Sequence, residues 1–276
     1  MNDTYKTEFG HPLLTETRDR YLREVVTKIN SSHPELYDEI CEILETAMKN
    51  KMTDVINKRL SKACLPGYPD NYRLDDFNQS CLSGKDLKVF KELRTLEFIN
   101  SNQPNLLIYG PPGFGKEKIA IGLGDLLCRR NHIVRYVDFH TFINTIKNHG
   151  VIAKSNSIYD DLEKVEILII DDFAGINVYD QEIIDGIYIL LKTRLDNHLL
   201  AFSETRKNRR MVMIPRLTII TTCHPIGKWT EHFSTDPMTV LKMINILYGS
   251  GHIISVDDNP SKLENSFTNP SSENPQ

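Results

Sequence analysis

The sequence predicts a three-layer α/β fold with a buried parallel sheet, preceded by a helical N-terminal region. Two observations support this fold class: short apolar runs alternate with helical patterns after about residue 100, and a glycine-rich stretch directly follows the first run. Strands covered by helices on both faces read as continuous apolar runs, not as alternating ones. With 276 residues, 40% of them hydrophobic, the chain can bury one substantial core and a smaller appendage.

Changes in composition along the chain predict three regions. Residues 1–80 are expected to form a helical N-terminal arm and a linker, and residues 81–256 the α/β core. Residues 257–276 are polar and interrupted by proline, with too little apolar surface to offset the entropy cost of ordering. We therefore expect this tail to be disordered.

Helical periodicity predicts a long amphipathic helix in the arm. From Pro34 to Leu60 apolar residues recur at steps of three and four, with Ser32 as the expected cap and Pro66-Gly67 as the end. The apolar stripe is interpreted as a docking face. The opposite, basic face is either a solvated surface or a contact for nucleic-acid phosphates.

The core is expected to open with a helix capped by Ser83, with Asp86 reaching back to the cap. Five apolar runs then follow, each bounded by turn or helix signals, and we interpret them as the strands of one parallel sheet. They are residues 105–109, 134–139, 166–172, 216–222 and 252–256.

A phosphate-binding loop is predicted between the first strand and the helical pattern that follows it. In such loops glycines let backbone N–H groups converge on phosphate oxygens at the start of a helix, and a lysine neutralises the β- and γ-phosphates. The pattern then requires Ser or Thr, where this chain has glutamate. The predicted nucleotide-binding residues are Gly110, Pro111, Pro112, Gly113, Phe114, Gly115, Lys116 and Glu117.

Two acidic residues end the third predicted strand, in the stretch ILIIDD. A phosphate-loop ATPase needs a carboxylate there to hold Mg²⁺ and another to orient the attacking water. We assign Asp171 to the first role and Asp172 to the second. The alternative, two acids in an ordinary turn, is disfavoured by the phosphate loop upstream.

Several stretches in this order resemble the IstB-like and DnaC-like ATPases of the AAA+ class. They include KRLSKACLPGYPDNYRLDDFNQS, LLIYGPPGFGK, ILIIDDFAG, LTIITTCHPIGKW and DPMTVLKMINIL, and the resemblance spans roughly residues 55 to 256. It implies an AAA+ core that binds ATP and Mg²⁺ and assembles with itself. It also implies contact with DNA or with a DNA-bound partner, for which a transposase and a replicative helicase are the candidates.

Three departures from this family pattern bear on activity. Glu117 replaces a hydroxyl that ligates Mg²⁺, Cys223 replaces a polar sensor, and the position expected for a second sensor arginine falls at Asn245-Ile246. A carboxylate repels a phosphate charge by about 4 kcal/mol at about 4 Å in a medium of intermediate dielectric. The same carboxylate is a hard-oxygen ligand for Mg²⁺, so Glu117 and Asp171 are the candidate metal ligands.

A basic cluster lies in the segment 201–216, before the fourth core strand: Arg206, Lys207, Arg209 and Arg210. We expect a solvated loop, a contact with DNA phosphates or an arginine finger for a neighbouring subunit. Arg194 and Arg216 are the rival candidates for that finger. Trp229 is expected to be a packing anchor and not a base-stacking platform.

Charge and cysteine usage narrow the class of protein. The formal net charge is −4 and the pI about 6.1, so nucleic acid has to be contacted through a local basic patch. The five cysteines lack CxxC spacing, and the N-terminal residues lack a signal-peptide layout, so we expect a cytoplasmic protein. No apolar run approaches the roughly 18 residues of a membrane span.

The leading hypothesis is an ATP-binding, DNA-associated AAA+ helper of transposition or helicase loading, with weak or impaired hydrolysis. The alternative is a degenerate ATPase that acts as a nucleotide-independent interaction module. A small-molecule kinase is a third, less favoured class, because no arginine-rich lid with a substrate pocket is apparent in the sequence.

Overall fold

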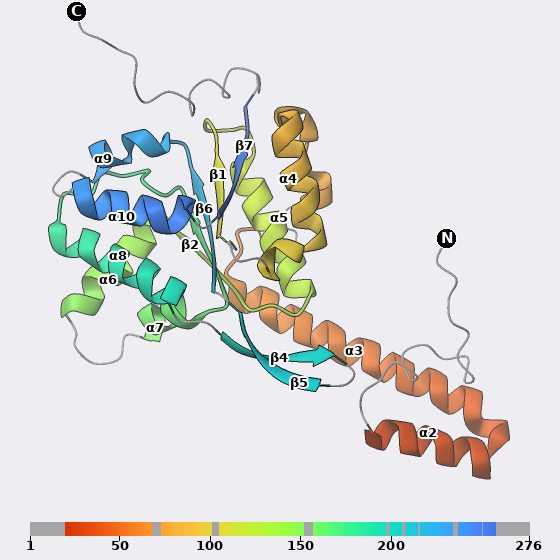
Figure 1. The fold of residues 1–276 in the computed structure, drawn as a ribbon. Helices are drawn as coiled ribbons and strands as arrows, with labels where there is room; N and C mark the ends of the chain where they lie inside the picture. Colours follow the sequence, from red (N-terminus) through yellow and green to blue (C-terminus); the bar gives the residue numbers. More distant parts are fainter. Residues whose placement is uncertain are drawn as a thin grey trace, which may run out of the picture. The chain divides into compact units, whose positions relative to one another are not determined.

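The computed structural model describes residues 20–67, 73–100, 105–151, 157–196, 199–205, 208–214, 216–233, 237–249 and 251–257. The chain divides into two compact units, Met1–Lys58 and Arg59–Gln276, which are treated separately below. The domain boundaries expected from the sequence stay predictions, and the expected disordered tail lies outside the described residues apart from Asp257. Figure 1 shows the elements in chain order.

The N-terminal unit contains helix α2 (Arg20–Ser32), the short 3₁₀ helix η1 (Pro34–Leu36) and most of α3 (Tyr37–Ala63). A small apolar cluster built on Val26, Tyr37 and Cys41 holds these helices together. Ser32 is the last residue of α2, and His33 is the residue before η1, so the expected cap at Ser32 is wrong. The periodicity itself does correspond to a long helix, α3.

The second unit is built on a five-stranded sheet with the order β2-β3-β6-β1-β7, in which all neighbouring strands are parallel. Every predicted core strand is present, within one residue at each end, which confirms the predicted α/β fold class. The strands are β1 (Asn105–Tyr109), β2 (Val134–Asp138), β3 (Ile167–Asp171), β6 (Leu217–Thr222) and β7 (Gly251–Ser255).

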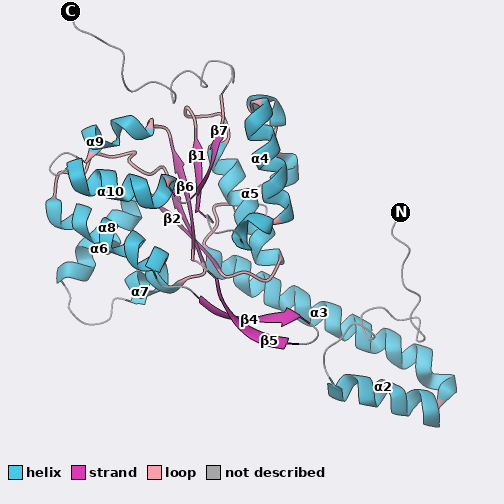
Figure 2. Ribbon diagram, viewed as in Figure 1, coloured by secondary structure: helices cyan, strands magenta, loops and turns pink. Residues whose placement is uncertain are grey.

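Helices cover both faces of this sheet, as Figures 1 and 2 show. On one face lie α4 (Gly84–Thr95) and α5 (Lys116–Arg129). The other face carries α6 (Phe139–Val151), α7 (Ser157–Lys164), α8 (Gln181–Asp196), α9 (Trp229–His232) and α10 (Pro237–Tyr248). The remaining 3₁₀ helices are η2 (Leu74–Asp76), η3 (Gln79–Cys81), η4 (Glu97–Asn100) and η5 (Ile226–Lys228).

Helix α4 starts as the sequence predicts. The Ser83 hydroxyl accepts a hydrogen bond from the Asp86 amide at 3.1 Å, which satisfies a backbone donor of the first turn. Asp86 also accepts from the Ser255 amide at 3.0 Å and so ties the helix to β7. The helix ends at Thr95, because Leu96 adopts a left-handed conformation with φ +61°.

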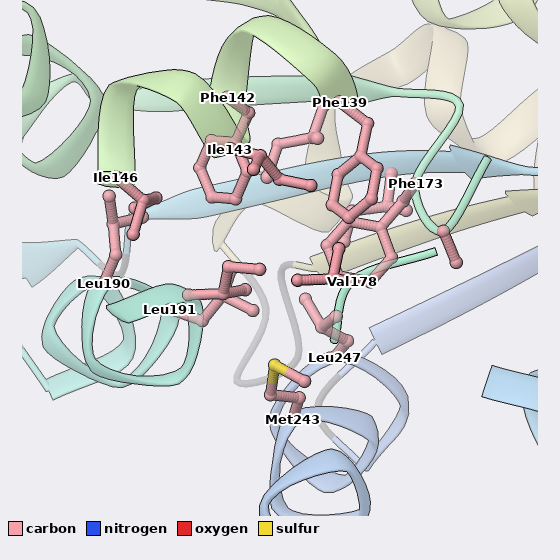
Figure 3. Close-up of a cluster of buried hydrophobic side chains, with 14 of the residues drawn as sticks. Phe139, Phe142, Ile143, Ile146, Phe173, Val178, Leu190, Leu191, Met243 and Leu247 are labelled. Carbon is pink, nitrogen blue, oxygen red and sulfur yellow. The ribbon is translucent and has the colours of Figure 1, made fainter. Parts of the chain in front are cut away.

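An aromatic and aliphatic cluster between the sheet and α6, α8 and α10 forms the main core (Figure 3). The Phe139 and Phe173 rings lie 4.7 Å apart, and Phe173 packs 4.9 Å from the indole of Trp229. Trp229 is 1% exposed and its Nε1 donates to the His224 carbonyl at 3.1 Å. Trp229 is therefore a packing anchor, as predicted. It contacts Phe173, which follows β3, and His224, which follows β6.

None of the described helices has the combination of length and apolar composition that a bilayer-spanning segment requires.

Candidate nucleotide-binding site

The predicted phosphate loop connects β1 to α5. Gly113 and Gly115 have φ angles of +87° and +92°, which side-chain-bearing residues rarely adopt. A Cβ at Gly110 would lie 2.3 Å from the Val256 carbonyl oxygen, so only glycine fits there. Gly115 caps α5 without a side-chain hydrogen bond, and the first amides of a helix are groups that commonly bind anions. Pro111, Pro112 and Phe114 complete the loop.

Three strands end at the same edge of the sheet as this loop. Tyr109 at the end of β1 pairs with Thr222 of β6, and Ile170 of β3 pairs with Ile220. Backbone bonds continue past the strands: the Gly110 amide donates to the Thr222 carbonyl at 3.1 Å. The residues that follow β1, β3 and β6 are therefore brought together, although the chain separates them by about fifty residues or more.

Asp171, the predicted metal ligand, has both carboxylate oxygens engaged. Oδ2 accepts from the Tyr136 hydroxyl at 2.8 Å, and Oδ1 accepts from the Thr221 hydroxyl. Burial and the Asp171 charge raise the pKa of Tyr136 far above its usual range, so this phenol stays a donor. The two hydroxyls fix the orientation of the Asp171 side chain at the carboxyl end of β3.

Asp172, the predicted water-orienting residue, is exposed and has φ +53°. Its amide donates to the Thr221 hydroxyl at 2.9 Å, and the Cys223 thiol lies 3.7 Å from its Oδ1. Burial and the neighbouring Asp172 carboxylate raise the pKa of Cys223, which keeps the thiol protonated. A thiol is a weak donor, so Asp172 receives little orientation from the sensor position.

Glu117 lies in the first turn of α5, close enough to Asp171 for their charges to interact. Partial burial and then the Asp171 carboxylate raise the pKa of Glu117, and Lys116 opposes them. Two crowded carboxylates fit a hard divalent cation, so Asp171 and Glu117 are the residues that would hold Mg²⁺. No cluster of three or more His, Cys, Asp or Glu among the described residues could hold a metal alone. Phosphate oxygens and water would therefore complete the coordination.

Sequence reasoning missed three side chains at this edge: Tyr136, Thr221 and His224. The His224 ring lies 4.0 Å from that of His232, and burial followed by this neighbour lowers the pKa of His224. His232 in turn faces the Asn177 side chain, with 2.8 Å between Nδ1 and Oδ1. Position gave a signal for two of them, because Thr221 lies in the last two residues of β6 and His224 follows that strand, whereas Tyr136 lies in the middle of β2 and no local pattern marks it.

The two residues at the position expected for a second sensor arginine do not lie at the phosphate-loop edge of the sheet. Asn245 and Ile246 lie on α10, and Ile246 is largely buried. The Ile246 carbonyl accepts from the Asn105 amide group at 3.1 Å, at the start of β1. The phosphate loop follows the other end of that strand. Ile246 therefore lies too far from the loop to take the place of a sensor residue at the nucleotide.

The rival finger Arg194 has a structural role instead. It is fully buried on α8, and its guanidinium donates to carbonyl and hydroxyl groups of two segments. These acceptors are Leu162, Glu163, Val165, Leu217 and Thr218. Arg216 also donates to the Glu163 carbonyl, at 2.8 Å. Because the Arg194 guanidinium is fully buried and its donors bond within this chain, it cannot reach a neighbouring subunit, and the finger hypothesis is wrong for Arg194.

The basic segment before β6 forms a hairpin and not the expected loop. Strands β4 (Leu199–Thr205) and β5 (Asn208–Ile214) pair antiparallel, with Thr205 opposite Asn208. The apolar run at the end of β5 favours a strand, which the loop interpretation overlooked. Arg209 and Arg210 lie on β5, whereas Arg206 and Lys207 lie outside the described residues.

Comparison with known proteins identifies the family. A family model described as IstB-like ATP binding protein matches residues 19–268. The chain belongs to the IstB-like ATP-binding protein family. An insertion sequence ATP-binding protein of Sinorhizobium fredii is 30% identical over 148 residues, which cover 54% of this chain and 52% of that protein.

A second relative, an IS21-like insertion sequence ATP-binding protein of Bacteroides fragilis, is 26% identical over 189 residues. This match covers 68% of this chain and 64% of the Bacteroides protein. The chain thus spans between half and two thirds of the length of these two relatives.

Solved structures share the fold at low sequence identity. DnaI aligns with a TM-score of 0.50 and 14% identity, over 67% of this chain and 87% of that one. DnaA from Aquifex aeolicus, bound to AMPPCP, aligns with a TM-score of 0.52 and 15% identity, over 71% of this chain and 53% of that one. These likenesses, with the strand order above, show the AAA+ P-loop fold, and the family model confirms the IstB-like resemblance seen in the sequence.

Proposed function

We propose that this protein is an ATP-binding, DNA-associated AAA+ helper that acts in transposition or in helicase loading and hydrolyses ATP weakly. One observation supports it above the others: the phosphate loop, Asp171 and Asp172 meet at the carboxyl edge of one parallel sheet. This edge is where open α/β folds bind their ligands. The insertion sequence relatives, which are named as ATP-binding proteins, favour the transposition branch.

In this proposal each side chain at the edge has a separate task. The amides of Gly113 to Lys116 and the Lys116 ammonium bind the phosphates of ATP. Asp171 would hold Mg²⁺, which would supply charge neutralisation on the phosphate oxygens, and Glu117 is the candidate for a second metal ligand. Asp172 orients the attacking water, and the weak Cys223 donor beside it accounts for slow turnover.

A direct experiment is equilibrium binding of a fluorescent ATP analogue with and without Mg²⁺. We expect ATP binding to require Mg²⁺. Three carboxylates, those of Glu117, Asp171 and Asp172, lie near the expected phosphate position, and the Lys116 ammonium balances the charge of one of them. Single-turnover phosphate release under the same conditions then measures hydrolysis. Absence of binding at millimolar analogue would contradict the proposal.

The second candidate is the degenerate module that acts without nucleotide. The excess of carboxylates over cations at the phosphate loop favours it. Without a bound cation, three carboxylates repel a triphosphate, and Glu117 repels it from the position where the family has a hydroxyl. The two candidates differ in one measurement. The helper binds ATP when Mg²⁺ is added, whereas the degenerate module does not bind it at any Mg²⁺ concentration.

The DNA part of the proposal extends to the basic hairpin, with a transposase or a replicative helicase as the protein partner and a cytoplasmic homo-oligomer as the working form. Changing Arg206, Lys207, Arg209 and Arg210 together to Gln should weaken DNA binding. It should also lower the slope of log affinity against log salt by up to about 4, since each lost phosphate contact removes about 0.9. An unchanged slope would remove the hairpin from the DNA contact and leave the ATP proposal intact.

A further inference from the structure

A second charged site lies on the same helix as the phosphate loop, but at its other end. A pocket of about 300 Å³ opens between η2, the end of α4 and the second half of α5. Its polar lining consists of four arginines and two aspartates: Arg73, Arg94, Arg129, Arg130, Asp75 and Asp125. Four positive against two negative side chains leave an excess of two positive charges.

Close backbone packing builds the walls of this pocket. A Cβ at Gly122 would lie 2.6 Å from the Leu74 amide nitrogen, so η2 lies directly against α5 because this position is glycine. Leu74 is buried, whereas the neighbouring Arg73 and Asp75 side chains are exposed. The main chain therefore holds Arg73 at the rim, next to the arginines that end α5.

The two aspartates orient two of the arginines. Asp125, which is 4% exposed, accepts from Arg129 Nε at 2.7 Å and from its Nη2 at 3.1 Å. Asp75 accepts from Arg94 across the pocket. Arg73 and Arg130 have no carboxylate in ion-pair range within the part of the chain that the structure describes. These two guanidinium groups carry the excess charge, and both are exposed.

Basic side chains continue beyond the pocket. The Arg59 guanidinium donates to the Asn131 side chain, one residue after Arg130. Arg135 on β2 donates to the Lys62 carbonyl at 3.2 Å, near the end of α3. The nearby acid Glu166 is paired with His132. A row of cations longer than one pocket fits a ligand with repeating negative charges better than a single small anion.

We propose that this arginine pocket binds the phosphodiester backbone of a nucleic acid. Guanidinium groups match phosphate oxygens through paired N–H donors, and two of the four are already fixed by their aspartates. The pocket lies at the end of α5, about 20 Å along the helix from Lys116 at 1.5 Å per residue, so it is separate from the nucleotide site. The inference rests on the proposed DNA association but not on ATP binding.

The test is fluorescence anisotropy of a short labelled DNA duplex across a series of salt concentrations. The pocket variant Arg73→Gln/Arg130→Gln removes two exposed charges, so the slope of log affinity against log salt should fall by about 2. At about 0.1 M salt the affinity should fall by tens of fold.

The matched control is Lys147→Gln/Lys242→Gln, which removes the same charge from α6 and α10 on the other face of the sheet (Figure 1). Its salt slope should stay close to that of the wild type. Thermal melts check that all variants fold. An unchanged slope in the pocket variant or an equal loss in the control would overturn the inference.

A second arm separates polymer phosphate from free phosphate. Inorganic phosphate is titrated against the DNA complex beside potassium chloride of equal ionic strength. We expect both salts to displace DNA alike. If phosphate displaces DNA far better and stabilises the wild type but not the pocket variant, the pocket is a small-anion site and the inference is wrong. If the wild type binds no DNA at all, the proposed DNA association fails, and the ATP experiment stands apart from it.

Discussion

The two ends of helix α5 carry opposite charge. At its start, Lys116 faces Glu117, Asp171 and Asp172, an excess of two negative charges. At its end, the arginine pocket has an excess of two positive charges. The first end can bind a polyanion only with an additional cation, whereas the second needs none. In the two proposals above, one helix thus carries a metal-dependent phosphate site and a metal-independent one.

The helix dipole explains part of this difference and makes Glu117 ambiguous. An acid in the first turn and cations in the last turn both stabilise a helix, each by roughly 0.3–1 kcal/mol. Glu117 and Arg129 therefore suit the folding of α5. The same charges have opposite effects on phosphate binding. Arg129 and Arg130 favour a bound phosphate, whereas Glu117 repels one unless a cation lies between them.

The largest effect is expected from Lys116→Ala, which removes the positive charge at the start of α5. Hydrogen bonds to charged groups contribute about 1.5–3 kcal/mol each, so two lost contacts lower ATP affinity roughly a hundredfold or more. DNA binding and its salt slope should not change, because the arginine pocket is intact. Equilibrium binding of fluorescent ATP and DNA anisotropy measure both properties on one preparation.

Lys118→Ala is the matched control, since it removes the same charge two residues along the same helix. It should leave ATP affinity within a few-fold of the wild type. Equal ATP affinity in Lys116→Ala and the wild type would refute the phosphate-loop assignment. A parallel loss of DNA binding in Lys116→Ala would show that the two ends are not independent.

The next effect, Glu117→Thr, makes the start of α5 less negative and restores the expected hydroxyl. We expect Mg·ATP binding to strengthen by about tenfold, or 1.4 kcal/mol, because one repulsive charge beside the triphosphate is lost. Thermal stability should not fall, since relief of the burial and of the Asp171 repulsion that raise the pKa of Glu117 offsets the lost interaction with the helix dipole. Titrating Mg²⁺ at fixed ATP for both proteins decides the role of Glu117.

A weaker complex in the threonine variant, with a shallower dependence on Mg²⁺, would contradict this expectation. It would assign Glu117 as a working metal ligand that has adapted to this site. Glu117→Gln provides the control for charge alone, because it keeps the length of the side chain. Hydrolysis should rise less than affinity in either case, since Cys223 remains beside Asp172.

The sequence predicted the parts of the site that are local in the chain. The strand β1, the glycines of the loop and Lys116 occupy one stretch, and Asp171 directly ends an apolar run. Each signal needs only a few consecutive residues, because steric rules and burial act on the local pattern. The same holds for the Ser83 cap and for all five core strands.

Features that depend on packing between distant segments were not predictable. Tyr136 and Thr221 reach Asp171 from 35 and 50 residues away, through a strand order that the sequence does not state. The arginine pocket depends on η2 lying against Gly122, and no local pattern indicates that contact. Arg194 failed as a finger for a related reason: arginine is usually exposed, and only the fold supplies the carbonyls that allow its burial.

The smallest effect is expected from Tyr136→Phe, which removes one of the two hydroxyls that hold Asp171. Partners behind a metal ligand commonly contribute about 10- to 100-fold to metal affinity. Here Thr221 still binds the other carboxylate oxygen, so we expect the Mg²⁺ concentration for half-maximal ATP binding to rise only a few-fold. Tyr159→Phe, at a buried tyrosine of α7, is the control for loss of a phenol elsewhere in the core.

The readout that separates a positioning role from a structural one is the dependence on metal. If Tyr136 positions Asp171, Tyr136→Phe shifts the Mg²⁺ titration while metal-free ATP binding, DNA binding and thermal stability stay close to those of the wild type. If Tyr136 only supports the fold, binding of both ligands declines together with the melting temperature. A Mg²⁺ titration that does not move would show that Thr221 alone suffices to orient Asp171, and that the negative end of α5 owes its metal dependence to Glu117.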